Sequence, residues 1–240
     1  EVIERPSSII KELVENSIDA NSKSIEIVIE QGGINKITVK DDGNGIDSKE
    51  LELAVTSHAT SKLSTLDDLN SITTLGFRGE ALASIGAVSH LSIKSKKKSC
   101  DASELSVTGG KIANIKPSSR NVGTTVTVRK LFLNIPARRK FLKSAKSEQI
   151  AITKCLKRFF LSHPQITFSY KNEHGLIFKL MPSKLKNRIC DVFGGEHHKS
   201  LIEINSTKSI YNISGFIGNI DLCRKRTSDQ YLYINNRFVS

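Results

Sequence analysis

The sequence predicts an α+β fold, in which an amphipathic helix precedes a series of antiparallel strands. Apolar residues recur at helical spacing from Ser8 to Ala20. Alternating apolar and polar residues then predict strands at Ser24–Glu30 and Ile34–Lys40. Because only Gln31-Gly32-Gly33 separates these two strands, we expect them to form an antiparallel hairpin.

The remainder of the chain predicts further helices and short strands. Helices are expected at Ser48–Thr56, Glu80–Gly86, Gln149–Leu161 and Leu185–Phe193. Strands are expected at Val88–Lys94, Glu104–Thr108, Lys111–Ile115, Thr124–Arg129, Ile166–Tyr170, Ile177–Leu180, 200–204, 210–217 and 230–235. The pattern restarts after Pro182-Ser183-Lys184, so we expect one domain over residues 1–183 and the beginning of a second over 184–240.

Composition narrows the class of protein. The 240 residues carry a formal net charge of +12, which favours a polyanionic partner over simple solubility only if the charges cluster. The four cysteines form no CxxC pair, so neither a zinc site nor a disulfide framework is expected. No apolar run is long enough to cross a bilayer, so no membrane partner is expected. The abrupt ends of the chain favour an excised part of a longer protein.

Three polar residues share one stripe of the first helix. At about 100° per residue, Glu12, Asn16 and Asp19 lie within roughly 60° of one another. Two carboxylates and an amide in line can hold a metal-bound polyphosphate and activate a water. A solvated helix face is the alternative, but Asn16 is a mediocre helix former with no packing role there.

Two glycine-bearing loops follow this helix. Gly43 and Gly45 come after the second strand, directly behind Asp41, while Gly76 and Gly79 lead into a helix. Such loops expose backbone N–H groups to anions, and together with the stripe they indicate a nucleotide site. The sequence patterns of other sites are absent. The chain has no GxxxxGK[ST] P-loop, and Gly43-Asn44-Gly45 lacks the third glycine of a dinucleotide fingerprint. Ile46 stands where a calcium loop needs an oxygen ligand, and no GxSxG nucleophile elbow occurs.

A second signal is basic. Between Arg129 and Lys146 there are seven Lys and Arg residues and no acidic residue: Arg129, Lys130, Arg138, Arg139, Lys140, Lys143 and Lys146. Such a cluster is typical of phosphate contacts that give affinity without reading sequence, although a solvated lysine-rich loop is the alternative. We expect Phe141 and Leu142 to anchor the segment while the charges point outward.

Taken together, the chain resembles the N-terminal ATPase region of the MutL family of DNA mismatch repair proteins. The matching stretches cover most of residues 1–160: Glu4–Pro6, Lys11–Ala20, Asp41–Ile46, His58–Lys62, Gly76–Leu82, Gly123–Val126 and Pro136–Phe141. The glycine loop and the Glu/Asn helix are shared with gyrase-type, chaperone and histidine-kinase ATPases, whereas Phe77–Glu80 and Pro136–Phe141 are more specific to MutL. Asp42 stands where many members have Asn, and we expect this change to be tolerated.

The resemblance implies a Bergerat-type ATPase sandwich, a mixed and mostly antiparallel sheet with helices on one face, followed by part of a second α/β domain of ribosomal-protein-like fold. It implies that Glu12 is the general base, that Asn16 ligates Mg²⁺, and that Asp41 accepts the adenine amino group of ATP. The implied nucleotide-binding set is Asn16, Asp19, Asp41, Gly43, Gly45, Thr60, Ser61, Lys62, Gly76, Phe77, Arg78, Gly79 and Thr125, with 76–79 in a mobile lid. The implied DNA-binding set is Arg138, Arg139, Lys140 and Lys143.

The same resemblance implies a function and partners. Binding of ATP would close the lid and drive homodimerisation around single- or double-stranded DNA, in concert with a mismatch-recognition protein of the MutS family. The setting would be the bacterial cytoplasm, near the nucleoid, or the nucleus of a eukaryote. A gyrase-type topoisomerase ATPase subunit and a catalytically silent DNA-binding scaffold remain the alternatives. A family lysine that contacts phosphate is expected just beyond Ser240, so hydrolysis by these 240 residues alone could be weak.

Overall fold

The computed structural model describes residues 3–56, 80–208, 211–223 and 229–239. The chain divides into two compact units, each made of two segments. The first unit comprises Glu1–Leu156 and Phe168–Lys179, and the second comprises Lys157–Thr167 and Leu180–Ser240. The long helix α5, Ala145–Ser162, therefore contributes residues to each unit.

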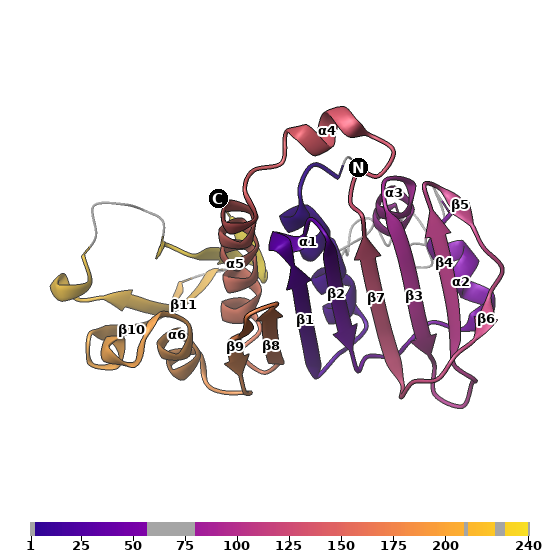
Figure 1. Cartoon of the computed structure of the whole chain (residues 1–240). Helices are drawn as coiled ribbons and strands as arrows, with labels where there is room; N and C mark the ends of the chain where they lie inside the picture. The colour runs from indigo at the N-terminus through magenta and orange to yellow at the C-terminus, as the bar shows by residue number, and fades with distance from the viewer. Residues whose placement is uncertain (1–2, 57–79, 209–210, 224–228, 240) are drawn as a thin grey trace. The chain divides into compact units, whose positions relative to one another are not determined.

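One sheet runs through the first unit (Figure 1), and its strands within the described residues follow the order β5-β4-β3-β7-β2-β1-β8-β9, with β6 also paired to β4. Their bounds are β1 Ser24–Glu30, β2 Lys36–Asp41, β3 His90–Lys96, β4 Ser103–Thr108, β5 Lys111–Ile112, β6 Lys116–Pro117, β7 Gly123–Arg129, β8 Thr167–Asn172 and β9 Gly175–Leu180. The pairs that link β1, β2, β7, β3 and β4 are antiparallel. The predicted α+β class with a mostly antiparallel sheet is confirmed.

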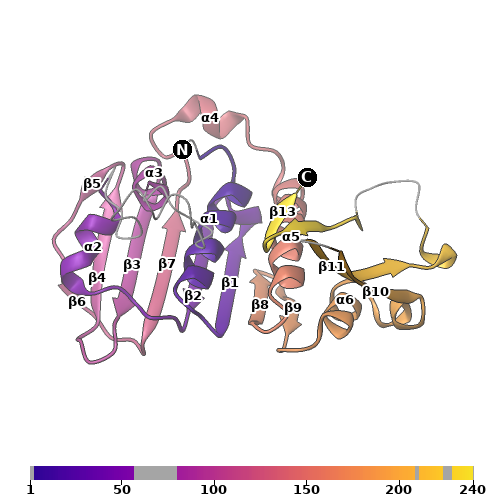
Figure 2. The same ribbon diagram turned by 180° about the vertical axis from the view of Figure 1, so that it is seen from behind.

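Three helices cover one face of this sheet: α1 (Pro6–Asp19), α2 (Ser48–Ala54) and α3 (Ala81–Ala87), which lie behind the strands in Figure 1 and in front of them in Figure 2. The burial pattern explains the arrangement, because every second residue of β1 and β2 is buried. These positions meet the apolar side of α1, where Ile9, Ile10 and Val14 are fully buried. A Cβ on Gly33 would touch Pro6, Ile37 and Ile152, so α1, β2 and α5 meet at that point.

The second unit contains α6 (Leu185–Phe193), the hairpin of β10 (Leu201–Lys208) with β11 (Tyr211–Gly218), and the hairpin of β12 (Leu232–Ile234) with β13 (Arg237–Val239). Its internal anchor is Arg188 of α6, whose side chain is fully buried. The guanidinium donates hydrogen bonds of 2.8–3.0 Å to the carbonyl oxygens of Phe160, Pro164, Ile166 and Met181. These bonds tie α6 to the end of α5 and to the loop that follows it.

Two short elements differ from the sequence predictions for physical reasons. The sequence predicts one strand at 230–235, but Asn235 and Asn236 adopt positive φ angles of 49° and 63° and turn the chain into a second strand. The helix α4, Pro136–Lys140, has only five residues, too few for an apolar period to be recognised. Across the described part of the chain, no helix combines the length and apolar character needed to cross a bilayer.

Candidate functional site

Asp41, the last residue of β2, lies at the centre of the candidate site. Its side chain is only 6% exposed. One carboxylate oxygen, Oδ1, accepts hydrogen bonds from the backbone N–H groups of Gly43 at 3.0 Å and Thr124 at 3.1 Å. The other oxygen, Oδ2, lies 3.1 Å from the Ser17 hydroxyl of α1. The carboxylate thus joins α1, the glycine loop and β7.

The Asp41 carboxylate retains capacity to accept another donor. A carboxylate offers about four acceptor positions, and three neighbouring donors are present. Ser17 has a single hydroxyl proton and also lies 3.0 Å from the carbonyl oxygen of Leu13, so it serves one acceptor at a time. Burial raises the pKa of Asp41 above its ordinary value, while the donors from Gly43, Thr124 and Ser17 and the charge of Arg120 oppose that rise.

Glycine is required at three positions around this carboxylate. A Cβ on Gly43 would come within 2.6 Å of the Ala20 carbonyl oxygen. Gly45, with φ of 71°, lies against the Lys96 carbonyl, and Gly123, with φ of 121°, lies against the Asp41 carbonyl. The loop can therefore pack closely against α1 and β3 only because these residues lack side chains.

Asp42 and Asn44 fix the near side of the glycine loop. Asp42 Oδ1 accepts hydrogen bonds of 2.8 Å from the backbone N–H groups of Lys23 and Ser24. The N–H of Asn44 donates to the Ala20 carbonyl at 2.9 Å. Asp42 thus binds the backbone before β1 and leaves Asp41 as the carboxylate of the site.

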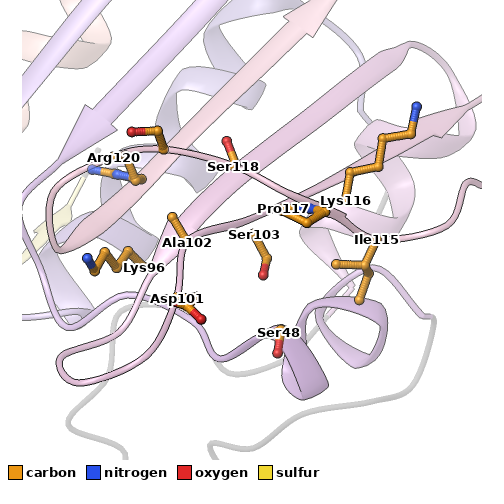
Figure 3. A pocket seen from close by; sticks show the side chains of 11 residues that line it. Ser48, Lys96, Asp101, Ala102, Ser103, Ile115, Lys116, Pro117, Ser118 and Arg120 are labelled. Carbon is orange, nitrogen blue, oxygen red and sulfur yellow. The ribbon is translucent and has the colours of Figure 1, made fainter.

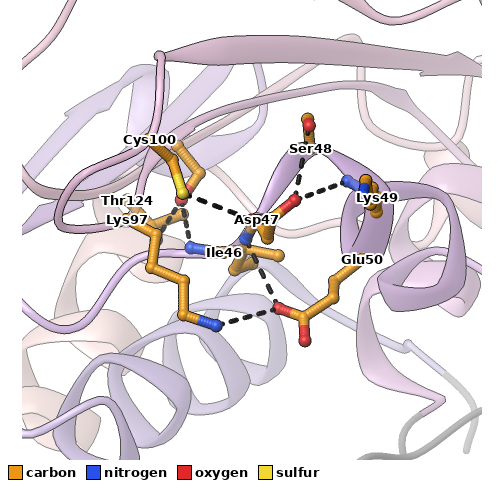
Figure 4. Close-up of polar contacts among 9 residues, drawn as sticks. Ile46, Asp47, Ser48, Lys49, Glu50, Lys97, Cys100 and Thr124 are labelled. Carbon is orange, nitrogen blue, oxygen red and sulfur yellow. Dashed lines mark hydrogen bonds and ion pairs between the residues drawn. The ribbon is translucent and has the colours of Figure 1, made fainter.

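The far side of the loop is fixed by Ser95 of β3, Thr124 of β7 and Asp47, the residue that caps α2 (Figure 4). The Ile46 N–H donates to Ser95 Oγ at 2.7 Å, and Ser95 Oγ lies 3.0 Å from Thr124 Oγ1. Asp47 caps α2 by accepting from the Lys49 N–H at 3.0 Å, and it also accepts from the Cys100 thiol at 3.4 Å. These contacts hold the loop in one conformation beside Asp41.

The predicted stripe on α1 is present, and it is wider than predicted. Glu12, Asn16 and Asp19 are half-buried on one face of the helix, and Glu15 lies on the same face between them. Lys11 bridges two of the carboxylates, with Nζ 2.8 Å from Glu12 and 3.3 Å from Glu15. The Glu12 and Glu15 side chains are only 13% and 12% exposed. The face therefore gathers three carboxylates, and Lys11 offsets part of their negative charge.

Glu15 is the residue of this face that the sequence reasoning missed. Burial raises its pKa to about 7, Lys11 opposes the rise, and the negative charges of Glu12 and Asp19 add to it. Glu15 could have been recognised from its spacing, because positions 12, 15, 16 and 19 follow the i, i+3, i+4, i+7 pattern of one helix face.

Three further residues around Asp41 are not predicted from the sequence. Thr124 contributes its N–H and lies on the buried face of β7, whereas the predicted Thr125 points to the opposite face and pairs with Lys40 in the neighbouring strand. Ser17 falls on the apolar side of α1 by its spacing. Arg120 donates to the Asp41 carbonyl at 2.8 Å and to the Lys94 carbonyl at 3.1 Å. The structure thus brings Asp41 and Thr124 together, but not Asp41 and the Thr125 side chain.

Several predicted site residues lie outside the described residues: Thr60, Ser61, Lys62, Gly76, Phe77, Arg78 and Gly79. Among the residues that are described, no group of three or more His, Cys, Asp or Glu side chains could hold a metal ion.

The basic segment separates into one anchored and several exposed charges. Arg138 donates to the Ile3 carbonyl at 3.0 Å and lies 5.7 Å from the centre of the Phe132 ring. Arg139, Lys140 and Lys143 are exposed. The expectation that Phe141 anchors the segment is wrong, because its side chain is 84% exposed. Arg138 on Phe132 provides the anchor instead.

A cavity of about 620 Å³ opens between α2 and the strands β4 and β6 (Figure 3). Lys96, Lys116 and Arg120 bring positive charge to its lining, and Asp101 brings negative charge. None of the site residues predicted from the sequence lines it. We therefore define the candidate site by the Asp41 contacts and the polar face of α1 and not by this cavity.

Comparisons with known proteins assign the chain to a family. A model described as histidine kinase-, DNA gyrase B- and HSP90-like ATPase matches residues 4–128, and a model of the DNA mismatch repair protein C-terminal domain matches residues 189–240. The whole chain is 45% identical to the DNA mismatch repair protein MutL of Clostridium botulinum (strain Kyoto / Type A2). The chain belongs to the MutL family of DNA mismatch repair proteins. It is also 40% identical to MutL of Parabacteroides distasonis, and it spans 36% and 39% of the lengths of these two relatives.

Solved structures agree with the MutL assignment. The Aquifex aeolicus MutL ATPase domain complexed with ADP superposes with a TM-score of 0.76 at 29% identity, covering 99% of this chain and 84% of that one. The N-terminal domain of a DNA repair protein gives a TM-score of 0.81 at 31% identity, covering 100% of this chain and 75% of that one. The ATPase family model spans α1, the glycine loop and most of β7, which are the elements that meet at Asp41.

Proposed function

We propose that this chain is the ATP-binding part of a mismatch repair ATPase, with residues 1–183 as the ATPase domain and 184–240 as the start of a second domain. The observation that carries the proposal is the buried Asp41 carboxylate, which has backbone donors on one oxygen and acceptor capacity to spare on the other. ADP bound to the related Aquifex domain supports a nucleotide ligand.

Asp41 suits adenine for a simple chemical reason. A fixed, buried acceptor favours a base with an exocyclic amino group, because a carbonyl oxygen at the same place would leave two acceptors facing each other. The glycines at 43, 45 and 123 pack directly against backbone carbonyl groups, and this packing keeps the loop close to the carboxylate. The predicted contact of Thr125 with the adenine side of the nucleotide remains part of the proposal.

The polar face of α1 would hold the phosphate end. The Asn16 amide oxygen would ligate Mg²⁺, which binds few protein groups and completes its shell with water and phosphate. When bound, the ion would offset phosphate charge. Glu12 would orient a water and take its proton, while Lys11 holds the Glu12 carboxylate in place at 2.8 Å.

Membership of the family supports the larger cycle that we propose. Closure of a lid that includes residues 60–62 and 76–79 would accompany binding of ATP, and homodimerisation would then enclose DNA, with a MutS-type protein supplying mismatch recognition. The exposed Arg139, Lys140 and Lys143 would contact phosphates without reading sequence, and Arg138 would position them.

Replacing Asp41 by Asn tests the nucleotide site. In the unliganded protein the Asn oxygen can accept from Gly43 and Thr124 while its NH₂ donates to Ser17, which can turn its proton to Leu13. We therefore expect the unliganded melting temperature to change little and the stabilisation by ATP to disappear, as measured by thermal shift. Asp42→Asn is the matched control and should keep the response to ATP. A full response in Asp41→Asn would refute the adenine contact.

Replacing Glu12 by Ala tests the hydrolytic role. ATP binding should survive and turnover should fall by about 10²-fold or more, because a positioned general base contributes that much. Turnover and nucleotide affinity should both be measured for each variant and for the wild type. Glu15→Ala is the comparison, since both carboxylates contact Lys11. If Glu15→Ala removes turnover and Glu12→Ala does not, the base is Glu15.

A further inference from the structure

Phe141 is an aromatic side chain displayed to solvent. It is 84% exposed, whereas Phe132, nine residues earlier, is fully buried. The Phe141 ring therefore contributes little to the core, and its exposure carries a hydrophobic cost in the described structure. A ring in this position is suited to contact with a flat apolar partner.

The backbone that carries Phe141 is ordered by specific contacts. The Phe141 N–H closes α4 by donating to the Arg138 carbonyl at 3.1 Å. Arg138 is itself tied to the Ile3 carbonyl. Two residues later, the Lys143 N–H donates to Glu148 at 3.0 Å, and the same buried carboxylate oxygen lies 3.3 Å from Arg5. These contacts hold the backbone at Phe141, which directly follows α4, and α4 lies beyond the ends of the strands in Figure 1.

Basic residues flank the exposed ring in the sequence. Arg139, Lys140, Lys143 and Lys146 lie within five residues of it, and all four are exposed. Charge complementarity therefore favours a polyanion, and the aromatic ring favours a polyanion that also has flat, unpaired rings. Single-stranded DNA has both features, while a duplex hides its base faces within the stack.

We propose that Phe141 is a stacking site for an unpaired nucleobase, and that the exposed basic residues beside it hold the adjoining phosphates. The proposal rests on the proposed role in DNA repair and deepens it, because it gives the basic surface a preference for single strands. Phosphate contacts alone would not distinguish the two forms of DNA in this way.

Substitution of Phe141 separates stacking from charge. Phe141→Ala should weaken binding of a single-stranded oligodeoxythymidylate by about fivefold or more, since it removes stacking on one base. Affinity for a duplex of equal length and the salt dependence of binding should change little, because every phosphate contact remains. Phe141→Tyr should restore binding and Phe141→Leu should not. Leu176→Ala, which removes another exposed apolar side chain of the same unit, is the matched control.

A spectroscopic test uses the absence of tryptophan from the 240 residues. Phe141→Trp introduces a single reporter at the proposed site. Its fluorescence should be quenched by single-stranded DNA and not by the duplex or by heparin, a polyanion without bases.

Three results would overturn the proposal. Equal loss of single-strand and duplex affinity in Phe141→Ala would assign the ring to the general DNA surface. Unchanged DNA binding with a lower melting temperature, or with loss of ATP-dependent dimerisation, would assign it to packing against another segment or another copy of the chain. If the wild-type chain binds neither form of DNA, the proposed DNA contact itself fails.

Discussion

The Asp41 carboxylate is subject to two opposing effects. Removal from water disfavours its charged form and raises its pKa, whereas the N–H groups of Gly43 and Thr124 and the Ser17 hydroxyl favour the charged form. Burial is the larger effect, so the pKa of Asp41 is raised in the folded protein. Folding and ionisation of this side chain therefore oppose each other, which is typical of a group kept for binding and not for stability.

This opposition predicts a pH dependence of unfolding. Because the folded-state pKa is raised, the folded protein holds the Asp41 proton at pH values where the unfolded chain has released it. The stability of the wild type relative to Asp41→Asn should therefore fall as pH rises from about 4, the ordinary aspartate range, through the raised pKa, and then level off. Melting temperatures without nucleotide or metal, measured for both proteins across this range, check the sign. A relative stability that rises with pH would contradict it.

The sequence alone predicts those site residues that can be recognised from their immediate sequence neighbours. Asp41 precedes a glycine loop, and the α1 stripe follows helical spacing, so both can be recognised. Ser17 cannot, because a small polar residue among Leu13 and Val14 resembles core packing until a strand places a carboxylate beside it. Whether Thr124 or Thr125 faces the site depends on which residues of β7 point inward. Two adjacent threonines do not determine this from the sequence.

At the scale of elements, the loop between β2 and α2 is defined by what glycine allows. Gly45 has a positive φ and packs on the Lys96 carbonyl of β3, so this contact fixes how the loop follows the strand. The cap at Asp47 then starts α2 with both halves of a capping box. Loop and cap together hold Ile46 on Ser95, which adjoins Thr124.

Replacing Gly45 by Ala tests this arrangement. The new Cβ would meet the Lys96 carbonyl in a backbone conformation that alanine adopts poorly, so we expect a loss of about 1–3 kcal/mol in the free energy of unfolding. Gly175→Ala is the matched control, because Gly175 also has a positive φ, of 130°, but has nothing within 4 Å of its Cβ position. Denaturant unfolding of both variants separates the two effects. Equal losses would show that the Lys96 contact contributes nothing.

Element boundaries show why some of the fold could be predicted and some could not. The strand β1 and the helix α6 fall at the predicted residues, because each has a clear period and flanking turn residues. The strand β6 has two residues and is defined only by pairing with β4, so its own sequence holds no signal. Similarly, the start of β13 depends on the turn at Asn235-Asn236, and two asparagines are equally compatible with the end of a single strand.

At the scale of the whole molecule, the excess of positive charge is divided by position. Some basic residues are internal ties, such as Arg188 on four carbonyls and Arg138 on Ile3. Others pair with carboxylates, such as Lys36 with Glu30 and Lys171 with Glu26. In the described part of the structure, the exposed basic side chains around α4 show neither kind of contact. They are therefore available to a polyanion.

Reversal of two of these charges tests where DNA binds. Arg139→Glu with Lys140→Glu should weaken DNA binding uniformly across sequences and flatten the dependence of log affinity on log salt by roughly one to two units, about one for each phosphate that the variant no longer neutralises. Arg138 is left unchanged because its reversal would also break the tie to Ile3.

Lys111→Glu with Lys179→Glu is the control, because it alters the net charge equally on exposed strand residues, and it should have a smaller effect. ATP binding without DNA should persist, since Asp41 and α1 belong to other segments. Equal losses of affinity in the two reversed pairs would show that net charge, and not the surface at α4, determines the binding of DNA.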